Sequence, residues 1–167
     1  RKTLADLGFD VQRLDPARLR LYGNAMGTLP QANQVYRPDD LTENPIRFVG
    51  DANTTFDDNE YFLFYARGPH TWTRAGSAAR FQHYLNPYTD TAYYFLTVGS
   101  SAGRRVVAAP VVTGASSARI TAFTERQFYE VELINLAKSG RTWLGESFTA
   151  TDQKTFSFPV ADLVPGT

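Results

Sequence analysis

The residues that decide the fold class are YFLFYA at positions 61–66 and AYYFLTV at positions 92–98. Both runs are short and rich in aromatic residues, and a glycine follows each of them within two positions, which is typical of β-strands. Both are apolar at consecutive positions rather than at alternate ones. They therefore predict central strands that are covered on both faces.

Segments on either side of these runs predict further short strands. Residues 18–22 alternate basic and apolar side chains, which is the pattern of a half-buried strand. Additional strands are predicted at residues 46–49, 71–73, 104–112, 118–124, 142–149 and 155–160. Residues 3–7 predict a short helix, whereas residues 128–137 fit neither a helical nor a strand period. Together these elements predict one mainly β domain over residues 1–167, a β-sandwich or jelly roll with one or two short helices.

The composition excludes several classes of protein. Hydrophobic residues make up 43% of the 167 residues and charged residues 20%, which are values of a folded domain and not of a disordered chain. The 17 basic and 17 acidic residues cancel, so the chain lacks the positive excess of a nucleic-acid-binding module. No apolar run approaches the roughly 18 residues needed to cross a bilayer. We therefore expect neither a nucleic-acid partner nor a transmembrane segment.

The residue types that are present limit the chemistry. There is no cysteine, so thiol catalysis, disulfides and cysteine-ligated metals are excluded. The two histidines, His70 and His83, are too few for a three-histidine metal site. We therefore assign no catalytic residue to this chain. Its start at Arg1, without a methionine or a signal peptide, predicts a piece of a longer gene product.

The stretch DANTTFDDNE at residues 51–60 carries side-chain oxygens at alternating positions, an arrangement that suits calcium. The candidate ligands are Asp51, Asn53, Asp57 and Asp58. The stretch is not an EF-hand loop, because Thr55 and Phe56 stand where that loop needs Asp or Asn and then Gly. The alternative is an Asx-rich hairpin loop between two strands, without a metal. No other cofactor is predicted.

Aromatic residues make up 14% of the chain, and exposed rings on a β-domain can stack on sugars. The candidate glycan-binding rings are Trp72 and Tyr88. The alternative is that these rings belong to the core, which is where most rings of an aromatic-rich domain lie.

The stretch SGRTWLGESF at residues 139–148 predicts a structural turn. Its defining residues are Ser139, Gly140, Arg141, Trp143, Gly145 and Glu146. Since Arg141 and Glu146 flank Trp143, we expect an ion pair across the turn with the indole packed inside.

Six stretches of the chain, taken in order, resemble one family of bacterial surface proteins. They are residues 19–24, 40–44 and 56–69, then His83 with residues 86–90, and then residues 93–97 and 139–148. Their order and spacing are similar to the N-terminal region of the PorU-type surface sortases of the type IX secretion system of Bacteroidetes, which are relatives of the gingipain cysteine peptidases. The resemblance covers residues 3–160. The chain departs from the family at Asn59 and Glu60, where a Gly-Asp pair is usual.

The resemblance implies a function for a larger protein. Members of the family are exported, lie at the outer membrane, remove the C-terminal sorting domain of secreted cargo and help to attach that cargo to lipopolysaccharide. Their catalytic Cys-His pair belongs to a caspase-like α/β domain further along the chain, and no position of this sequence matches it. We therefore expect a non-catalytic accessory β-domain of an exported protein, at the outer membrane, at the cell surface or in the periplasm. Its expected partners are the downstream peptidase domain, secreted cargo and other secretion-system proteins. The alternative is a self-sufficient β-sandwich module that binds glycan, such as the sugars of lipopolysaccharide.

Overall fold

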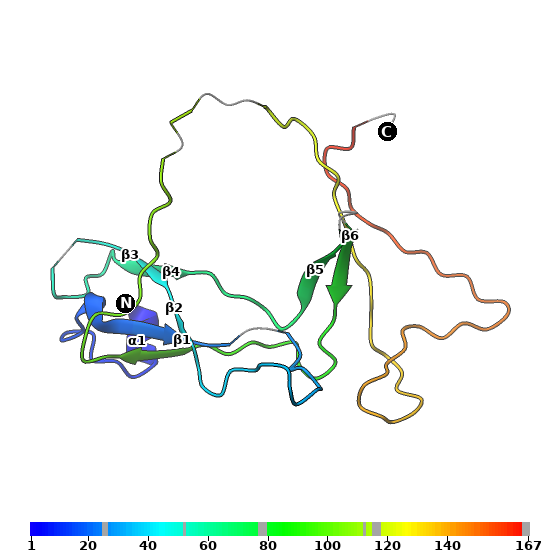
Figure 1. Ribbon diagram of the computed structural model, residues 1–167, viewed down its shortest axis with the longest axis horizontal. Coiled ribbons are helices and arrows are strands. Elements are labelled where there is room, and N and C mark those ends of the chain that lie inside the picture. The colour runs from blue at the N-terminus through cyan, green and yellow to red at the C-terminus, as the bar shows by residue number, and fades with distance from the viewer. Residues whose placement is uncertain (25–26, 52, 77–79, 112, 115–117, 165–167) are drawn as a thin grey trace. The chain divides into compact units, whose positions relative to one another are not determined.

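The computed structural model describes residues 1–24, 27–51, 53–76, 80–111, 113–114 and 118–164. The described chain is mainly β, with few helices and with small antiparallel sheets (Figure 1). It forms two compact units. The first unit comprises Arg1–Pro69 and Thr89–Pro110, and the second unit comprises His70–Tyr88 and Val111–Thr167.

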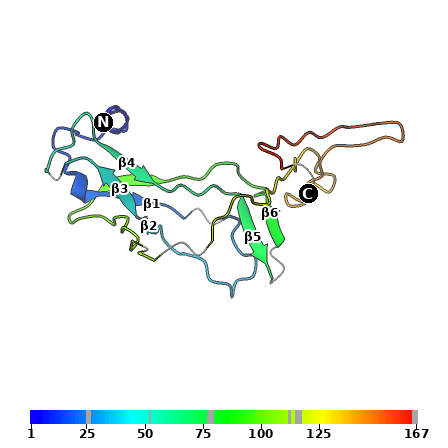
Figure 2. The ribbon, with the colours of Figure 1, turned by 90° about the horizontal axis from the view of Figure 1, so that it is seen from above.

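The first unit contains most of the regular structure. It begins with helix α1 (Lys2–Asp6), as the sequence predicts, and a single 3-10 turn (Pro16–Arg18) leads into the first strand. Strand β1 (Leu19–Tyr22) lies between β2 (Glu43–Asn44) and β7 (Phe95–Val98) in an antiparallel sheet. Strands β3 (Ile46–Val49) and β4 (Tyr61–Phe64) form an antiparallel hairpin that lies beside this sheet in Figures 1 and 2.

The hydrophobic core of the first unit follows from the alternation of apolar residues along β1. Leu19 and Leu21 are buried, and the two residues that alternate with them are half-buried, which confirms the half-buried strand predicted here. The buried core consists of Leu4, Leu14, Leu19, Leu21, Ile46 and Phe56. Phe56 stacks on Phe62 of β4 with ring centroids 5.4 Å apart, so the loop after β3 is anchored to the hairpin by its one fully buried ring.

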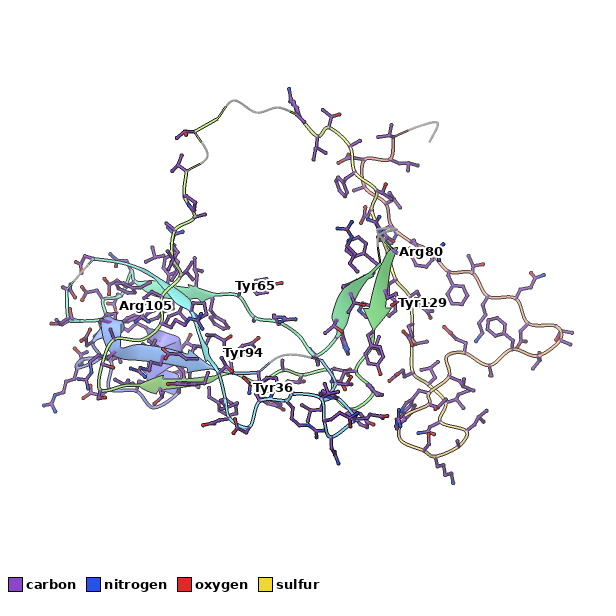
Figure 3. The ribbon with its side chains drawn as sticks, in the orientation of Figure 1. Tyr36, Tyr65, Arg80, Tyr94, Arg105 and Tyr129 are labelled. Atoms are coloured by element: carbon purple, nitrogen blue, oxygen red, sulfur yellow. The ribbon has the colours of Figure 1, made fainter. Side chains whose placement is uncertain are left out.

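Arg105 joins the chain after β7 to the start of β1. Its guanidinium donates hydrogen bonds to the carbonyl oxygens of Pro16 (2.7 Å), Ala17 (2.8 Å) and Leu19 (3.1 Å). Burial lowers the pKa of Arg105, which remains charged because that pKa starts so far above neutrality. Arg105 also forms a parallel bridge with Ile46, and Figure 3 shows it beside β1. Arg105 therefore ties three segments of the first unit together, through its side chain to residues 16–19 and through the backbone around it to β3.

The two runs predicted to be central strands lie at the edges of their sheets. Among the described residues, β4 pairs only with β3, and β7 pairs only with β1. Tyr61, Leu63 and Phe64 of β4 are 49%, 50% and 46% exposed, so the prediction of two covered faces is wrong for this run. The run does form a strand, as predicted, but only the face that carries Phe62 packs on the core of the first unit.

The described part of the second unit has one regular sheet. Strands β5 (Thr71–Ala75) and β6 (Arg80–Tyr84) form an antiparallel hairpin, in which Trp72 is opposite His83. β6 is absent from the sequence-based expectations because its polar residues do not alternate cleanly with apolar ones. A single antiparallel bridge joins Ile134 to Leu144.

Several predicted strands do not form in the described chain. Residues 118–124 and 155–160 form neither a strand nor a β-bridge among the described residues, and the segment 142–149 is reduced to the Leu144 bridge. The segment 104–112 is likewise reduced to the Arg105 bridge, and its residue 112 lies outside the described residues. A strand requires a neighbouring backbone along its length as well as a suitable sequence, and within the described residues these segments form at most a single bridge.

Candidate functional site

The first candidate site is the loop between β3 and β4, where three carboxylates converge. One oxygen from each of Asp51, Asp57 and Glu60 lies within 4.8 Å of the others. Asp51 and Asp57 are exposed, whereas Glu60 is only 6% exposed. Oxygen atoms at this separation could each contribute one ligand to a hard cation such as calcium.

Glu60 closes this loop through its two carboxylate oxygens. Its Oε1 accepts the backbone N–H of Asp51 at 2.9 Å, and its Oε2 accepts the backbone N–H of Asp57 at the same distance. Gly50 fits tightly against it, because a Cβ at position 50 would lie 2.3 Å from Glu60 Oε1. Two backbone donors are thus satisfied by one buried carboxylate, so hydrogen bonds hold the loop shut.

The structure brings together only part of the predicted calcium set. Asp51 and Asp57 are in the cluster, whereas the Asn53 amide nitrogen donates to Asp57 Oδ2 and its oxygen accepts the N–H of Thr55. Asp58 instead forms a 2.9 Å salt bridge with Arg1. These contacts are those of the Asx-rich hairpin loop that was the alternative interpretation. Calcium binding at this loop stays a prediction.

Glu60 is the residue of this cluster that the sequence-based reasoning missed. It lies at the end of the acidic stretch, next to the first residue of β4, and its spacing gives no sign of burial.

The second candidate site is the face of the β5–β6 hairpin that carries Trp72 and His83. Trp72 meets the His83 ring edge-on, with ring centroids 4.9 Å apart. The Phe128 ring packs on the other neighbour of this contact, His83, with ring centroids 3.5 Å apart. Next to this contact, the Arg126 guanidinium lies 4.5 Å from the centroid of the Phe81 ring. Arg126 and Phe128, which are two residues apart, thus contact the same face of the hairpin.

The alternate residues of this segment contact the C-terminal part of the second unit. The Gln127 side-chain amide donates to the Pro159 carbonyl, and the Tyr129 ring lies 4.8 Å from that of Phe156. Figure 3 shows Tyr129 on the segment that runs beside β6. Alternate side chains of residues 126–129 therefore contact two different segments, as those of a strand do. The sequence pattern of residues 128–137 did not decide between a helix and a strand.

The two predicted glycan-binding rings are both accessible. Trp72 is 47% exposed and Tyr88 is 65% exposed, so neither is a core ring. No ring contact joins them among the described residues. Trp72 belongs to the aromatic face of the hairpin, whereas the backbone N–H of Tyr88 donates to the side chain of Asn86 in the turn that follows β6.

The stretch 139–148 forms a loop closed by side chains. The Ser139 hydroxyl accepts the backbone N–H groups of Arg141 and Thr142, and Gly140 has a φ of 71°, which favours glycine. The loop returns through Leu144, which exchanges backbone hydrogen bonds with Ile134. This geometry explains Ser139 and Gly140 as turn-forming residues.

The ion pair expected between Arg141 and Glu146 is not among the salt bridges of the described residues. Glu146 accepts a hydrogen bond from the Tyr129 hydroxyl instead. This bond lowers the pKa of Glu146 and raises the pKa of Tyr129. Trp143 is 37% exposed and so is not packed inside the turn. Gly145 lies against Val131, since a Cβ there would be 3.4 Å from the Val131 carbonyl oxygen.

The comparisons with known proteins give no further assignment. Neither a protein-family model, nor a curated protein, nor a solved structure matches this chain. None of the helices in the described part of the chain has the length and apolarity to cross a membrane. The assignment of a function therefore depends on the residues and their geometry.

Proposed function

We propose that this chain is a non-catalytic N-terminal β-domain of a larger cell-surface cysteine peptidase of the PorU type, which removes C-terminal sorting domains from secreted cargo. The peptidase activity would belong to a downstream domain, because this chain has no cysteine. The parent protein would be exported and lie at the outer membrane, at the cell surface or in the periplasm. The six ordered motifs support this family.

The observation that carries the proposal is the uneven distribution of buried apolar side chains. All six buried hydrophobic residues of the described chain belong to the first unit. In the second unit, large apolar side chains remain exposed, including Ile120 at 84%, Phe123 at 83% and Leu136 at 75%. Large exposed apolar patches are typical of surfaces that contact another protein. It supports a domain that is covered by another polypeptide, such as the downstream peptidase domain, cargo or another secretion-system protein.

The β-sandwich or jelly roll belongs to the same proposal. Residues 126–129 already place alternate side chains on two sides, as a strand in a sandwich does. We propose that the extended segments of residues 118–164 form further sandwich strands when a neighbouring domain supplies backbone partners.

The coding sequence around this chain tests the proposal. We expect the reading frame to continue past Thr167 into an α/β domain that contains a cysteine and a histidine. An in-frame deletion of residues 1–167 in the producing cells should then leave cargo unprocessed. A stop codon directly after Thr167 would contradict the proposal.

Glycan binding is the second candidate function, because Trp72 and Tyr88 are both accessible to a sugar ring. The test measures binding of the polysaccharide purified from lipopolysaccharide to the wild-type chain, to Trp72→Ala and to Tyr88→Ala. Tyr36→Ala is the matched control, since Tyr36 is an 81% exposed ring of the first unit. Loss of binding in either variant but not in the control supports this function, and equal binding by all four proteins contradicts it.

A further inference from the structure

The β5–β6 hairpin has one face that is both basic and aromatic. Trp72 and Arg74 alternate along β5, and the strand register places His83 opposite Trp72 and Phe81 opposite Arg74. Residues directly opposite each other in an antiparallel pair point to the same face, so these four side chains share it. Arg74 is exposed and Phe81 is 44% exposed, so this part of the face is open to solvent.

Arg126 brings a second guanidinium to the same face. Its Cζ atom lies 4.5 Å from the centroid of the Phe81 ring, and Arg74 is directly opposite Phe81 on the neighbouring strand. Arg126 Nη1 donates to the Thr124 carbonyl oxygen at 3.2 Å, which uses one of the five N–H donors of a guanidinium. Two like charges beside one ring repel each other, and an anion bound between them would offset that repulsion.

No acidic residue of the hairpin neutralises these two guanidiniums. Residues 61–89 contain three arginines and two histidines but no Asp or Glu, although the whole chain has equal numbers of basic and acidic residues. None of the salt bridges among the described residues involves Arg74 or Arg126. The face therefore has a local positive charge that suits a negatively charged ligand.

Two glutamates of the segment next to the hairpin make other contacts. Glu125 accepts a hydrogen bond from the Gln127 side chain at 3.4 Å. The charge of Glu130 acts on His83, which is opposite Trp72 and not opposite Arg74. An anion beside Arg74 would therefore lie at the other end of the face from the Glu130 charge.

The Trp72 indole is placed to stack on a sugar ring beside the guanidiniums. It is 47% exposed, and the rings of His83 and Phe128 cross it at 71° and 77°, so neither of these rings stacks on its face. Trp72 and Arg74 are two residues apart on one strand, which puts their Cα atoms about 7 Å apart. A ring stacked on the indole would therefore lie within reach of the Arg74 side chain.

We propose that this face binds an acidic polysaccharide built from uronic acids, whose pyranose ring stacks on Trp72 while its carboxylate pairs with Arg74 and Arg126. A uronic acid carries its carboxylate directly on the ring, so one sugar can make both contacts. The two coplanar carboxylate oxygens also match the fork of a guanidinium. This inference rests on glycan binding, the second candidate function, and adds the class of sugar.

Isothermal titration calorimetry of the full chain with oligogalacturonate tests this inference. The comparison ligand is the same oligosaccharide after its carboxyl groups have been reduced to alcohols, which keeps the rings and removes the charge. The wild type should bind the acidic form about tenfold more tightly, because charge-assisted hydrogen bonds are stronger than neutral ones. Polyglutamate, an acidic polypeptide without sugar rings, should not bind.

Variants of the face separate the charge from the ring. Arg74→Gln and Arg126→Gln should each weaken binding of oligogalacturonate by about tenfold without changing binding of the reduced form. Trp72→Ala should weaken binding of both forms. Arg119→Gln is the matched control, because it removes the same charge from an exposed position of the second unit outside this face.

Four results would overturn the inference. They are no binding of oligogalacturonate by the wild type, equal affinity for its two forms, binding of polyglutamate as tight as that of oligogalacturonate, and an equal loss in Arg119→Gln and Arg74→Gln. Glycan binding itself would still stand if the wild type bound both forms equally and Trp72→Ala bound neither. The lipopolysaccharide polysaccharide also tests that function independently of uronic acids.

Discussion

Glu60 shows how one residue can determine the form of a loop. Its carboxylate accepts two backbone N–H groups, from Asp51 and Asp57, while its side chain is almost completely buried. Glu60→Ala leaves both donors without that acceptor, so we expect the free energy of unfolding to fall by about 2–4 kcal/mol. Chemical denaturation of the variant and the wild type measures this difference.

The control for Glu60 is its exposed neighbour Asp58. The salt bridge between Asp58 and Arg1 joins a carboxylate that is 82% exposed, so Asp58→Asn should cost less than about 1 kcal/mol. Equal losses in Glu60→Ala and Asp58→Asn would show that the buried carboxylate does not close the loop.

Residue spacing predicted only part of the candidate sites. Asp51 and Asp57 could be assigned to one cluster because they stand in one acidic stretch. The burial of Glu60 could not be read from that stretch, since it depends on Gly50 and on Phe56 folding onto the hairpin. The packing of Phe128 on His83 was likewise beyond prediction, because 45 residues separate the two rings in the sequence.

At the scale of the element, Gly140 determines whether the loop of residues 134–144 closes. Its φ of 71° lies in the left-handed region, so Gly140→Ala should cost about 1 kcal/mol. Hydrogen exchange at the amides of Ile134 and Leu144, which bond across the loop, should accelerate by about fivefold.

Gly68→Ala is the matched control for the Gly140 variant. Nothing lies within 4 Å of a Cβ at position 68, and its φ is outside the left-handed region. Exchange at Ile134 and Leu144 should therefore equal that of the wild type. The strain assigned to Gly140 would be wrong if Gly140→Ala also left both rates unchanged.

Strands could be predicted where apolar and polar residues alternate along a segment and a second strand lies close enough to pair with it. Residues 18–22 alternate and became β1, and residues 46–49 became β3 because β4 pairs along their whole length. Residues 118–124 and 155–160 have suitable strand sequences but form no strand or β-bridge in the described chain. Whether such a segment becomes a strand is decided by its neighbours, which a single sequence does not specify.

At the scale of the whole molecule, the two units should differ in local stability. The buried hydrophobic residues of the described chain are confined to the first unit. Amides of β1 and β7 should therefore exchange more slowly than those of β5 and β6, because local opening of the second unit exposes no buried apolar core. Hydrogen-exchange mass spectrometry of the isolated chain measures this order. Equal protection of the β1–β7 strand pair and of the β5–β6 hairpin would contradict the assignment of the core to the first unit.

The mass of the native protein in its source cells tests the proposed accessory domain most directly. An antibody raised against this chain should detect, in the outer-membrane fraction, a band far above the 18.6 kDa of the chain itself. That result would confirm that the chain is part of a larger protein at the outer membrane, as the accessory-domain proposal predicts. A band near 18.6 kDa that ends at the stop codon of its own gene would contradict the accessory-domain proposal, and glycan binding would become the leading function.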